Sequence, residues 1–136
     1  MSDLELPRWR PAALAVLPAL VAVNVLVYVA FGLAGHGWDN ADSEALIRWG
    51  SNFGPFTLGA EPWRLATYMA LHSGIFHIAV NTFTLVDFGR VCERLFGRGR
   101  FLALYLLSGI AGGIASLWWN PMVNSVGASG AISGLV

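Results

Sequence analysis

The sequence has few charged residues for its length. Only 12% of its 136 residues are Asp, Glu, Lys or Arg, whereas 56% are hydrophobic. A soluble domain of this length carries about a quarter charged residues, so too little polar surface remains to cover a globule in water. The lipid bilayer is therefore the expected solvent. After Arg100 the chain contains no charged residue at all.

Two further shortages exclude classes of partner and site. The formal net charge is zero, which argues against nucleic acid as a partner, because such partners require a basic patch. Cys92 is the one cysteine, so the chain has no internal disulfide and a thiolate metal cluster is not expected. We interpret Cys92 as a packing residue and expect neither a metal nor a cofactor.

Three long apolar segments, at 12–34, 65–88 and 101–119, dominate what is present. About 20 apolar residues cross a hydrocarbon core of about 30 Å, so each segment is predicted to span the membrane. A secretory signal peptide is the alternative for the first, but its apolar region measures only about 7–15 residues. The sequence predicts an all-α polytopic transmembrane bundle with three spans, a tail at 1–10 and a fourth helix starting at about residue 128.

The connection between the first two expected spans, residues 35–64, is acidic on balance. Asp42 or Ser43 can cap a short helix within it. Tryptophan on the apolar face suits an amphipathic helix at the lipid headgroups, and an ordinary loop helix packed on the spans fits equally well. The apolar residues that fall on one face of this helix are Leu46, Trp49 and Phe53.

Arginines predict the orientation of the spans. Short cytoplasmic loops carry an excess of Lys and Arg, so the arginine-rich connection between the second and third spans is expected to be cytoplasmic. The tail is expected on the same side, and the acidic connection and the loop at Asn120 on the outer side. The arginines concerned are Arg8 and Arg10 in the tail and Arg90, Arg94, Arg98 and Arg100 in the connection.

Three polar residues, His72, His77 and Asn81, lie in the second expected span, where polar groups are costly and usually mark function or pairing. His77 and Asn81 are four residues apart and share a helix face. His72 lies about 140° further round a continuous helix and is expected to point elsewhere. The predicted orientation places His77, Asn81 and Ser129 together in the outer half of the membrane.

Structural roles explain the same residues. Histidines in a span can hydrogen-bond a neighbouring helix, and Gly130 and Gly134 form a small-xxx-small pair suited to close helix packing. A metal site built on His72 and His77 is a weak alternative, because the two side chains diverge and no third ligand lies near. Periodicity and spacing do not choose among these interpretations.

The order of the motifs resembles that of the rhomboid intramembrane serine proteases, from about Trp63 to Val136. The resemblance implies a truncated rhomboid domain over 11–136. The matching blocks are Trp63-Arg64, HSGIFHIAVN at 72–81, Gly89, Glu93 and Gly97 in GRVCERLFG, Tyr105-Leu106, and GASG at 127–130.

This resemblance implies that Ser129 is the nucleophile. It also implies that His77 and Asn81 form the oxyanion hole, together with the backbone N–H of Ser129, which suits a reaction that needs preorganised donors. Glu93 is expected to order the cytoplasmic end of the second span. The positions implied to be structural are Trp63, Arg64, His72, Glu93, Gly127, Gly130 and Gly134.

The general base of this family is a histidine on the sixth span, and no histidine of this sequence matches it. A serine hydroxyl is a poor nucleophile without an adjacent base. We therefore expect an incomplete chain, inactive alone, from a six-span endopeptidase that cleaves transmembrane segments of membrane proteins. The family resemblance suggests the bacterial inner membrane. The alternatives are a non-catalytic rhomboid-like protein that binds transmembrane partners and an unrelated membrane scaffold.

Overall fold

The computed structural model describes residues 13–136, and the tail predicted at 1–10 lies outside them. Within the described residues the regular structure is helical, apart from one isolated antiparallel bridge between Asn52 and Ser125. The predicted all-α class is therefore confirmed. The long helices are α1 (Val16–Phe31), α5 (Ile75–Phe96) and α6 (Arg98–Trp119).

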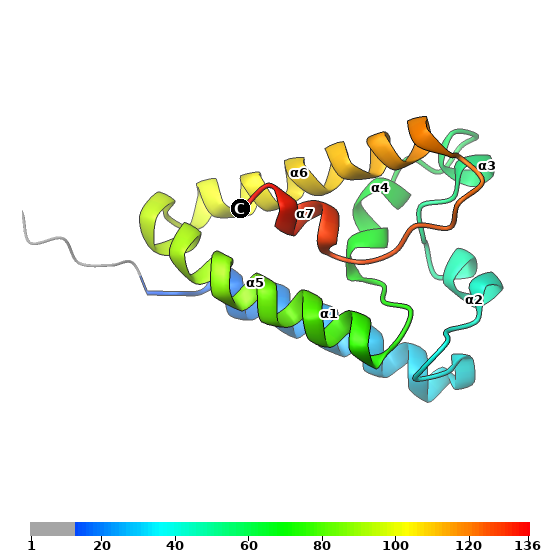
Figure 1. Ribbon diagram of the computed structural model, residues 1–136, viewed down its shortest axis with the longest axis horizontal. Helices are drawn as coiled ribbons and strands as arrows, with labels where there is room; N and C mark the ends of the chain where they lie inside the picture. Colours follow the sequence, from blue (N-terminus) through cyan, green and yellow to red (C-terminus); the bar gives the residue numbers. More distant parts are fainter. Residues whose placement is uncertain (1–12) are drawn as a thin grey trace, which may run out of the picture.

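Short helices fill the connections between the long ones. In Figure 1, α1 and α5 lie side by side, α6 diverges from them, and α7 lies between α5 and α6. The helices of the first connection gather at the end of the molecule opposite the α5–α6 turn. The short elements are the π-helical turn η1 (Gly32–His36), α2 (Ser43–Arg48), α3 (Gly54–Thr57), α4 (Arg64–Thr67), the 3-10 turn η2 (Tyr68–Ala70) and α7 (Ser129–Ser133).

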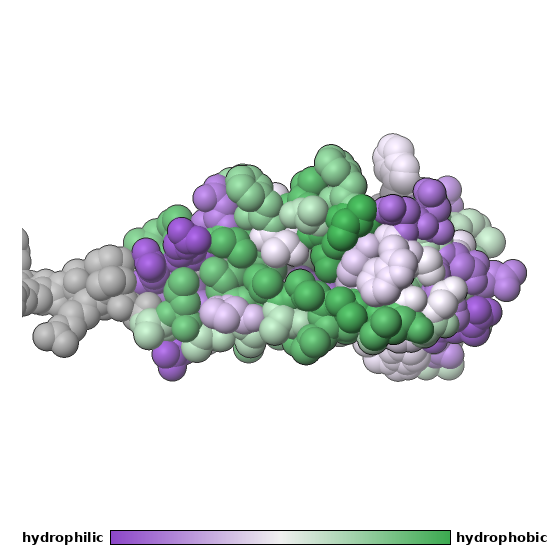
Figure 2. Space-filling model, turned by 90° about the horizontal axis from the view of Figure 1, so that it is seen from below, coloured by the Kyte–Doolittle hydropathy of each residue, from purple (hydrophilic) through white to green (hydrophobic). Residues whose placement is uncertain are grey.

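The three long helices are long and apolar enough to cross a membrane: Val16–His36, Ile75–Phe96 and Arg98–Trp119. Figure 2 shows a broad apolar band along one side of the molecule, with hydrophilic side chains gathered toward its two ends. Many large apolar side chains in these helices are exposed, including Phe76 (79%) and Phe83 (75%). Such surfaces are costly in water, whereas lipid solvates them.

The second long helix lies further along the chain than the apolar pattern predicts. The expected span is 65–88, but α5 begins at Ile75 and continues to Phe96. Before α5 begins, the chain forms the short helices α4 and η2. Leu71 follows η2 in an extended conformation. Apolar side chains of this stretch pack into the bundle, where Tyr68 and Met69 are each 4% exposed and Leu71 is 2% exposed.

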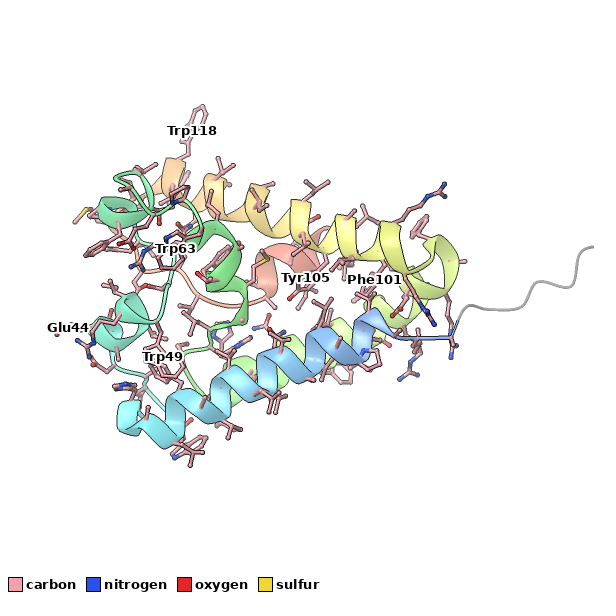
Figure 3. The ribbon with its side chains drawn as sticks, turned by 180° about the vertical axis from the view of Figure 1, so that it is seen from behind. Glu44, Trp49, Trp63, Phe101, Tyr105 and Trp118 are labelled. Carbon is pink, nitrogen blue, oxygen red and sulfur yellow. The ribbon has the colours of Figure 1, made fainter. Side chains whose placement is uncertain are left out.

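The main hydrophobic core lies between α6 and the α1–α5 pair. Phe101 and Tyr105 point from α6 into this space, whereas Trp118 points away from the molecule (Figure 3). Leu17 of α1 and Leu85 of α5 complete the same cluster. Cys92 also belongs to it, which agrees with its interpretation as a packing residue.

Glu93 joins the start of α1 to the end of α5. Its side chain is fully buried, and its carboxylate accepts hydrogen bonds from the backbone N–H groups of Ala15, Val16 and Leu17, each at 2.8 Å. The first N–H groups of a helix have no partner within the helix, so a side chain from elsewhere must satisfy them when they are buried. Glu93 is therefore the cap of α1, supplied by α5.

In the first connection, α2 packs on the bundle rather than standing free. Leu46 is 4% exposed and clusters with Phe31 and Leu71, which favours the loop-helix alternative. Asp42 caps α2 as predicted, because its carboxylate accepts from the N–H groups of Glu44 and Ala45.

Arg64 joins the end of this connection to its middle. Its buried guanidinium donates to the carbonyl oxygens of Ile47 (2.6 Å) and Ser51 (3.0 Å) and pairs with Glu61. The exposed ring of Trp63 lies beside the guanidinium, 4.9 Å from its carbon to the ring centroid. The Trp63-Arg64 pair therefore ties the start of α4 to the end of α2 and the chain that follows it.

The bridge at Asn52 connects this loop to the segment that precedes α7. Asn52 and Ser125 exchange both backbone hydrogen bonds at 3.0 Å, and Asn52 Nδ2 donates to the carbonyl oxygen of Gly113 on α6 (2.9 Å). Gly54 N–H also donates to the carbonyl oxygen of Pro121 (2.8 Å). The extended segment leading to Ser129 is thus held between the first connection and α6.

Candidate active site

Ser129 is the first residue of α7. Before it, Gly127 donates its N–H to the carbonyl oxygen of Tyr68 (2.9 Å), and after it, Ser133 Oγ donates to the carbonyl oxygen of Ser129 (2.8 Å). These bonds fix the backbone on both sides, while Ser129 itself remains exposed. The serine is therefore presented from a rigid segment.

A cavity of about 350 Å³ opens beside Ser129, between α5 and α7. The three residues that the sequence predicts to act together all line it, because His77 and Asn81 lie one turn apart on the face of α5 that meets α7. The lining consists of His77, Val80, Asn81 and Thr84 from α5 and Ser129, Ile132, Ser133 and Val136 from the C-terminal segment.

Gly127 allows the imidazole of His77 to contact the loop before Ser129. A Cβ at position 127 would lie 2.6 Å from Nε2 of His77, closer than real Cβ contacts allow. The backbone of Gly127 also has a φ of +111°, which side chains rarely tolerate. Both observations require glycine here, and the first places Nε2 of His77 against the GASG loop.

Asn81 is buried (6% exposed) yet reaches the cavity. Its Nδ2 donates one hydrogen bond to the carbonyl oxygen of His77 (2.9 Å), one turn earlier in α5. An amide nitrogen carries two N–H groups, so this bond orients the side chain and leaves a second donor. The same Nδ2 lies 3.7 Å from the Cβ that position 127 would carry.

His72 does not point away from His77, contrary to the helical prediction. The two rings are in contact, with centroids 5.1 Å apart and planes at 65°. The prediction assumed one continuous helix, but residues 71–74 precede α5 and are not helical. Within the described residues neither ring nitrogen of the buried His72 has a hydrogen-bond partner. Burial, followed by the neighbouring His77, lowers the pKa of His72 to about 4, so its ring is neutral.

Glycines hold α7 against α6. The Cα of Gly130 would lie 3.0 Å from a Cβ at Gly112, and a Cβ at Gly134 would collide with the side chain of Ser108. The packing interpretation of these small residues is thus correct for Gly130 and Gly134. It does not compete with a catalytic role for Ser129, because the serine faces the cavity from the same short helix.

Two features escape the sequence patterns. A second cavity of about 310 Å³, lined in part by Tyr68, Ser116 and Ser125, adjoins the other side of Ser129. Ser73 contacts His77 Nδ1 through its hydroxyl oxygen (3.0 Å) and its backbone N–H (3.4 Å). The four-residue spacing of Ser73 and His77 is the sequence signal for this contact, but the apolar pattern predicts a continuous helix over both residues and so does not single it out.

The described residues contain no group of three His, Cys, Asp or Glu side chains that could hold a metal ion. Within residues 13–136 the His72–His77 pair therefore has no third ligand of these types. A larger cavity of about 610 Å³ lies between α1 and α5, but its lining is almost entirely apolar, from Val25 to Phe83, and Ser129 does not reach it.

The fold and the cavity together define a helical membrane protein with a serine beside polar groups, and comparison with known proteins identifies its family. A family model described as the rhomboid domain matches residues 59–136. The chain belongs to the rhomboid family, and with its three membrane-crossing helices it is a multi-pass integral membrane protein.

Several curated relatives are similar to this chain. Rhomboid protease GluP of Bacillus subtilis is 40% identical over 114 residues, which cover 84% of this chain and 22% of GluP. Rhomboid protease AarA of Providencia stuartii is 34% identical over 143 residues, covering 94% of this chain and 50% of AarA. RHOMBOID-like protein 6, mitochondrial, of Arabidopsis thaliana is 46% identical over 78 residues, which cover 57% of this chain and 25% of that protein. The chain thus spans half the length of these relatives or less.

Proposed function

We propose that this chain supplies the nucleophile and the oxyanion-binding groups of an intramembrane serine protease. The observation that carries the proposal is the shared cavity, in which Ser129, His77 and Asn81 meet while Gly127 admits the imidazole of His77. Two of the relatives are named as rhomboid proteases, which supports the same function.

In the proposed reaction, Ser129 Oγ attacks the carbonyl carbon of a substrate peptide bond and its proton passes to a general base. The carbonyl oxygen becomes negatively charged and accepts hydrogen bonds from three donors: His77 Nε2–H, the Asn81 amide and the Ser129 backbone N–H. Losing one such donor typically costs about 2.7–4 kcal/mol of transition-state stabilisation. The base then gives the proton to the departing amine, and water hydrolyses the acyl-serine ester, which releases the carboxylic acid and restores the serine hydroxyl.

In this proposal the base comes from elsewhere. His77 is assigned to the oxyanion, His72 is buried and packs against His77, and His36 packs against Phe31 and Trp49 at the far end of α1. We propose that a histidine of a later span of the whole protein takes the proton, as the family resemblance implies. The relatives, of which this chain covers 22% and 50%, are long enough to contain such a span.

The substrates are proposed to be transmembrane segments of other membrane proteins. A hydrogen-bonded helix shields its carbonyl groups, so segments that unwind easily near the outer face of the bilayer are the preferred ones. The choice of the outer face follows from the proposed orientation, in which the arginine-rich α5–α6 turn and the N-terminus are both cytoplasmic.

The test uses the full-length protein in lipid vesicles with a transmembrane reporter. Ser129→Ala should reduce cleavage and labelling by a serine-reactive fluorophosphonate to background, because the attacking oxygen is gone. Ser43→Ala makes the same chemical change at the start of α2, outside the cavity lining, and should still be labelled. The proposal is wrong if Ser129→Ala retains cleavage or labelling.

The alternative, a non-catalytic protein that binds transmembrane partners, predicts a different pattern. The unaltered protein would then neither cleave the reporter nor react with the fluorophosphonate, yet it would co-purify with a membrane partner. The retention of Ser129, His77 and Asn81 around one cavity favours the protease.

A further inference from the structure

Ser73 lies immediately before α5, and two of its groups face the same ring nitrogen of His77. The hydroxyl oxygen is 3.0 Å from Nδ1, and the backbone N–H donates to Nδ1 over 3.4 Å. A hydroxyl can donate or accept, but a backbone N–H can only donate. Nδ1 therefore acts as an acceptor and carries no proton.

A neutral imidazole has one proton, so an unprotonated Nδ1 places it on Nε2. Nε2 is the nitrogen that lies against Gly127, on the side of the ring that faces Ser129 and its cavity. In the other tautomer, Nδ1 carries the proton and Nε2 presents a lone pair to the cavity. The Nδ1–H group would then face the backbone N–H of Ser73, and two donors would oppose each other. The contact at Ser73 thus decides whether His77 offers a donor or an acceptor to a bound group.

The hydroxyl of Ser73 is not occupied in capping the helix. Asp39 Oδ1 instead accepts from the N–H of Ile75, the first residue of α5. On the far side, the buried ring of His72 packs edge-on against His77 and limits its rotation. The hydroxyl bond is the shorter of the two contacts, since the N–H bond at 3.4 Å exceeds the usual range of about 2.7–3.2 Å.

We propose that Ser73 is a positioning residue that holds His77 as the Nε2–H tautomer and so keeps a hydrogen-bond donor directed at the oxyanion. This inference rests on the proposed function, because it gives His77 a donor role. Ser73 touches neither the substrate nor the reacting atoms. It acts through the imidazole, as a partner that fixes a tautomer does in other hydrolases.

The kinetic test compares Ser73→Ala with Ser73→Thr in the full-length protein. Ser73→Ala should lower kcat about tenfold with KM unchanged. This loss is smaller than the roughly 10²–10³ of removing an oxyanion donor, because the backbone N–H remains. Ser73→Thr keeps both the hydroxyl and the N–H and should restore kcat to within about twofold of the parent. Equal kcat for Ser73→Ala and the parent would overturn the inference.

A spectroscopic test reads the tautomer directly. Nitrogen NMR of the histidine-labelled Ser129→Ala protein, with His77→Gln to assign the signals, should show Nε2 protonated and Nδ1 unprotonated. Adding Ser73→Ala removes the shorter of the two contacts and should raise the fraction of the Nδ1–H form in part, because the backbone N–H still faces Nδ1, whereas Ser73→Thr should leave that fraction unchanged. An unchanged tautomer in Ser73→Ala would overturn the inference even if kcat fell. Because this measurement needs no activity, it remains decisive if the parent proves not to be a protease.

Discussion

At the scale of single residues, Gly127 is the position where the backbone and the site constrain each other most tightly. Gly127→Ala should abolish cleavage, because the added methyl would occupy the space of His77 Nε2 and meet an unfavourable φ. Displacing His77 removes one donor, so a loss of at least about 10²-fold in kcat is expected. The measurement is reporter cleavage together with thermal unfolding in detergent.

Gly99→Ala is the matched control. Position 99 lies in the first turn of α6, and a Cβ there would meet nothing within 4 Å. The control should keep the activity of the parent, since alanine favours helices over glycine. Retained cleavage in Gly127→Ala would show that the approach of His77 to the loop is not needed.

The residues of the site were easier to predict than the backbone that carries them. Ser129, His77 and Asn81 line one cavity, and the sequence predicts their proximity, while their roles stay predictions. The divergence of His72 from His77 and the span at 65–88 were both wrong for one reason. Apolar character reports burial, and it does not distinguish a membrane-crossing helix from a connection that packs inside the bundle. The contact of Ser73 with His77 forms because residues 71–74 are not helical, which the apolar pattern does not predict.

At the scale of elements, Glu93 makes α1 depend on α5. Glu93→Gln keeps the shape of the side chain, but its amide has one acceptor oxygen and directs an NH₂ group at N–H donors. We expect the free energy of unfolding to fall by about 3 kcal/mol, because buried backbone donors lose charged partners. The measurement is chemical unfolding in detergent, combined with hydrogen exchange of the N–H groups of Ala15, Val16 and Leu17.

Glu44→Gln provides the comparison for Glu93. Glu44 forms an exposed ion pair with Arg48, and its side chain is 84% exposed. Such pairs contribute about 0.5 kcal/mol or less. Equal effects of the two substitutions would contradict the capping role of Glu93.

At the scale of the whole molecule, the orientation in the membrane is open to direct measurement. The exposed arginines of the α5–α6 turn predict that this turn is cytoplasmic, and the loop at Asn120 is then on the outer side. In intact cells, a membrane-impermeant maleimide should label Asn120→Cys, and it should label Gly99→Cys only after permeabilisation. Both are made in a Cys92→Ala background. The reverse pattern would invert the proposed orientation and move Ser129 to the cytoplasmic half.

The cap at Glu93 also has a consequence for biosynthesis. Ala15, just before α1, is translated 78 residues before Glu93, whose carboxylate accepts the hydrogen bond from the Ala15 N–H. Unpaired backbone donors are expensive in lipid, so the first turn of the nascent α1 should wait among the headgroups. Only when α5 has been made can that turn withdraw from water together with the carboxylate. The first turn of α1 is therefore expected to reach its final place only after α5 has been made.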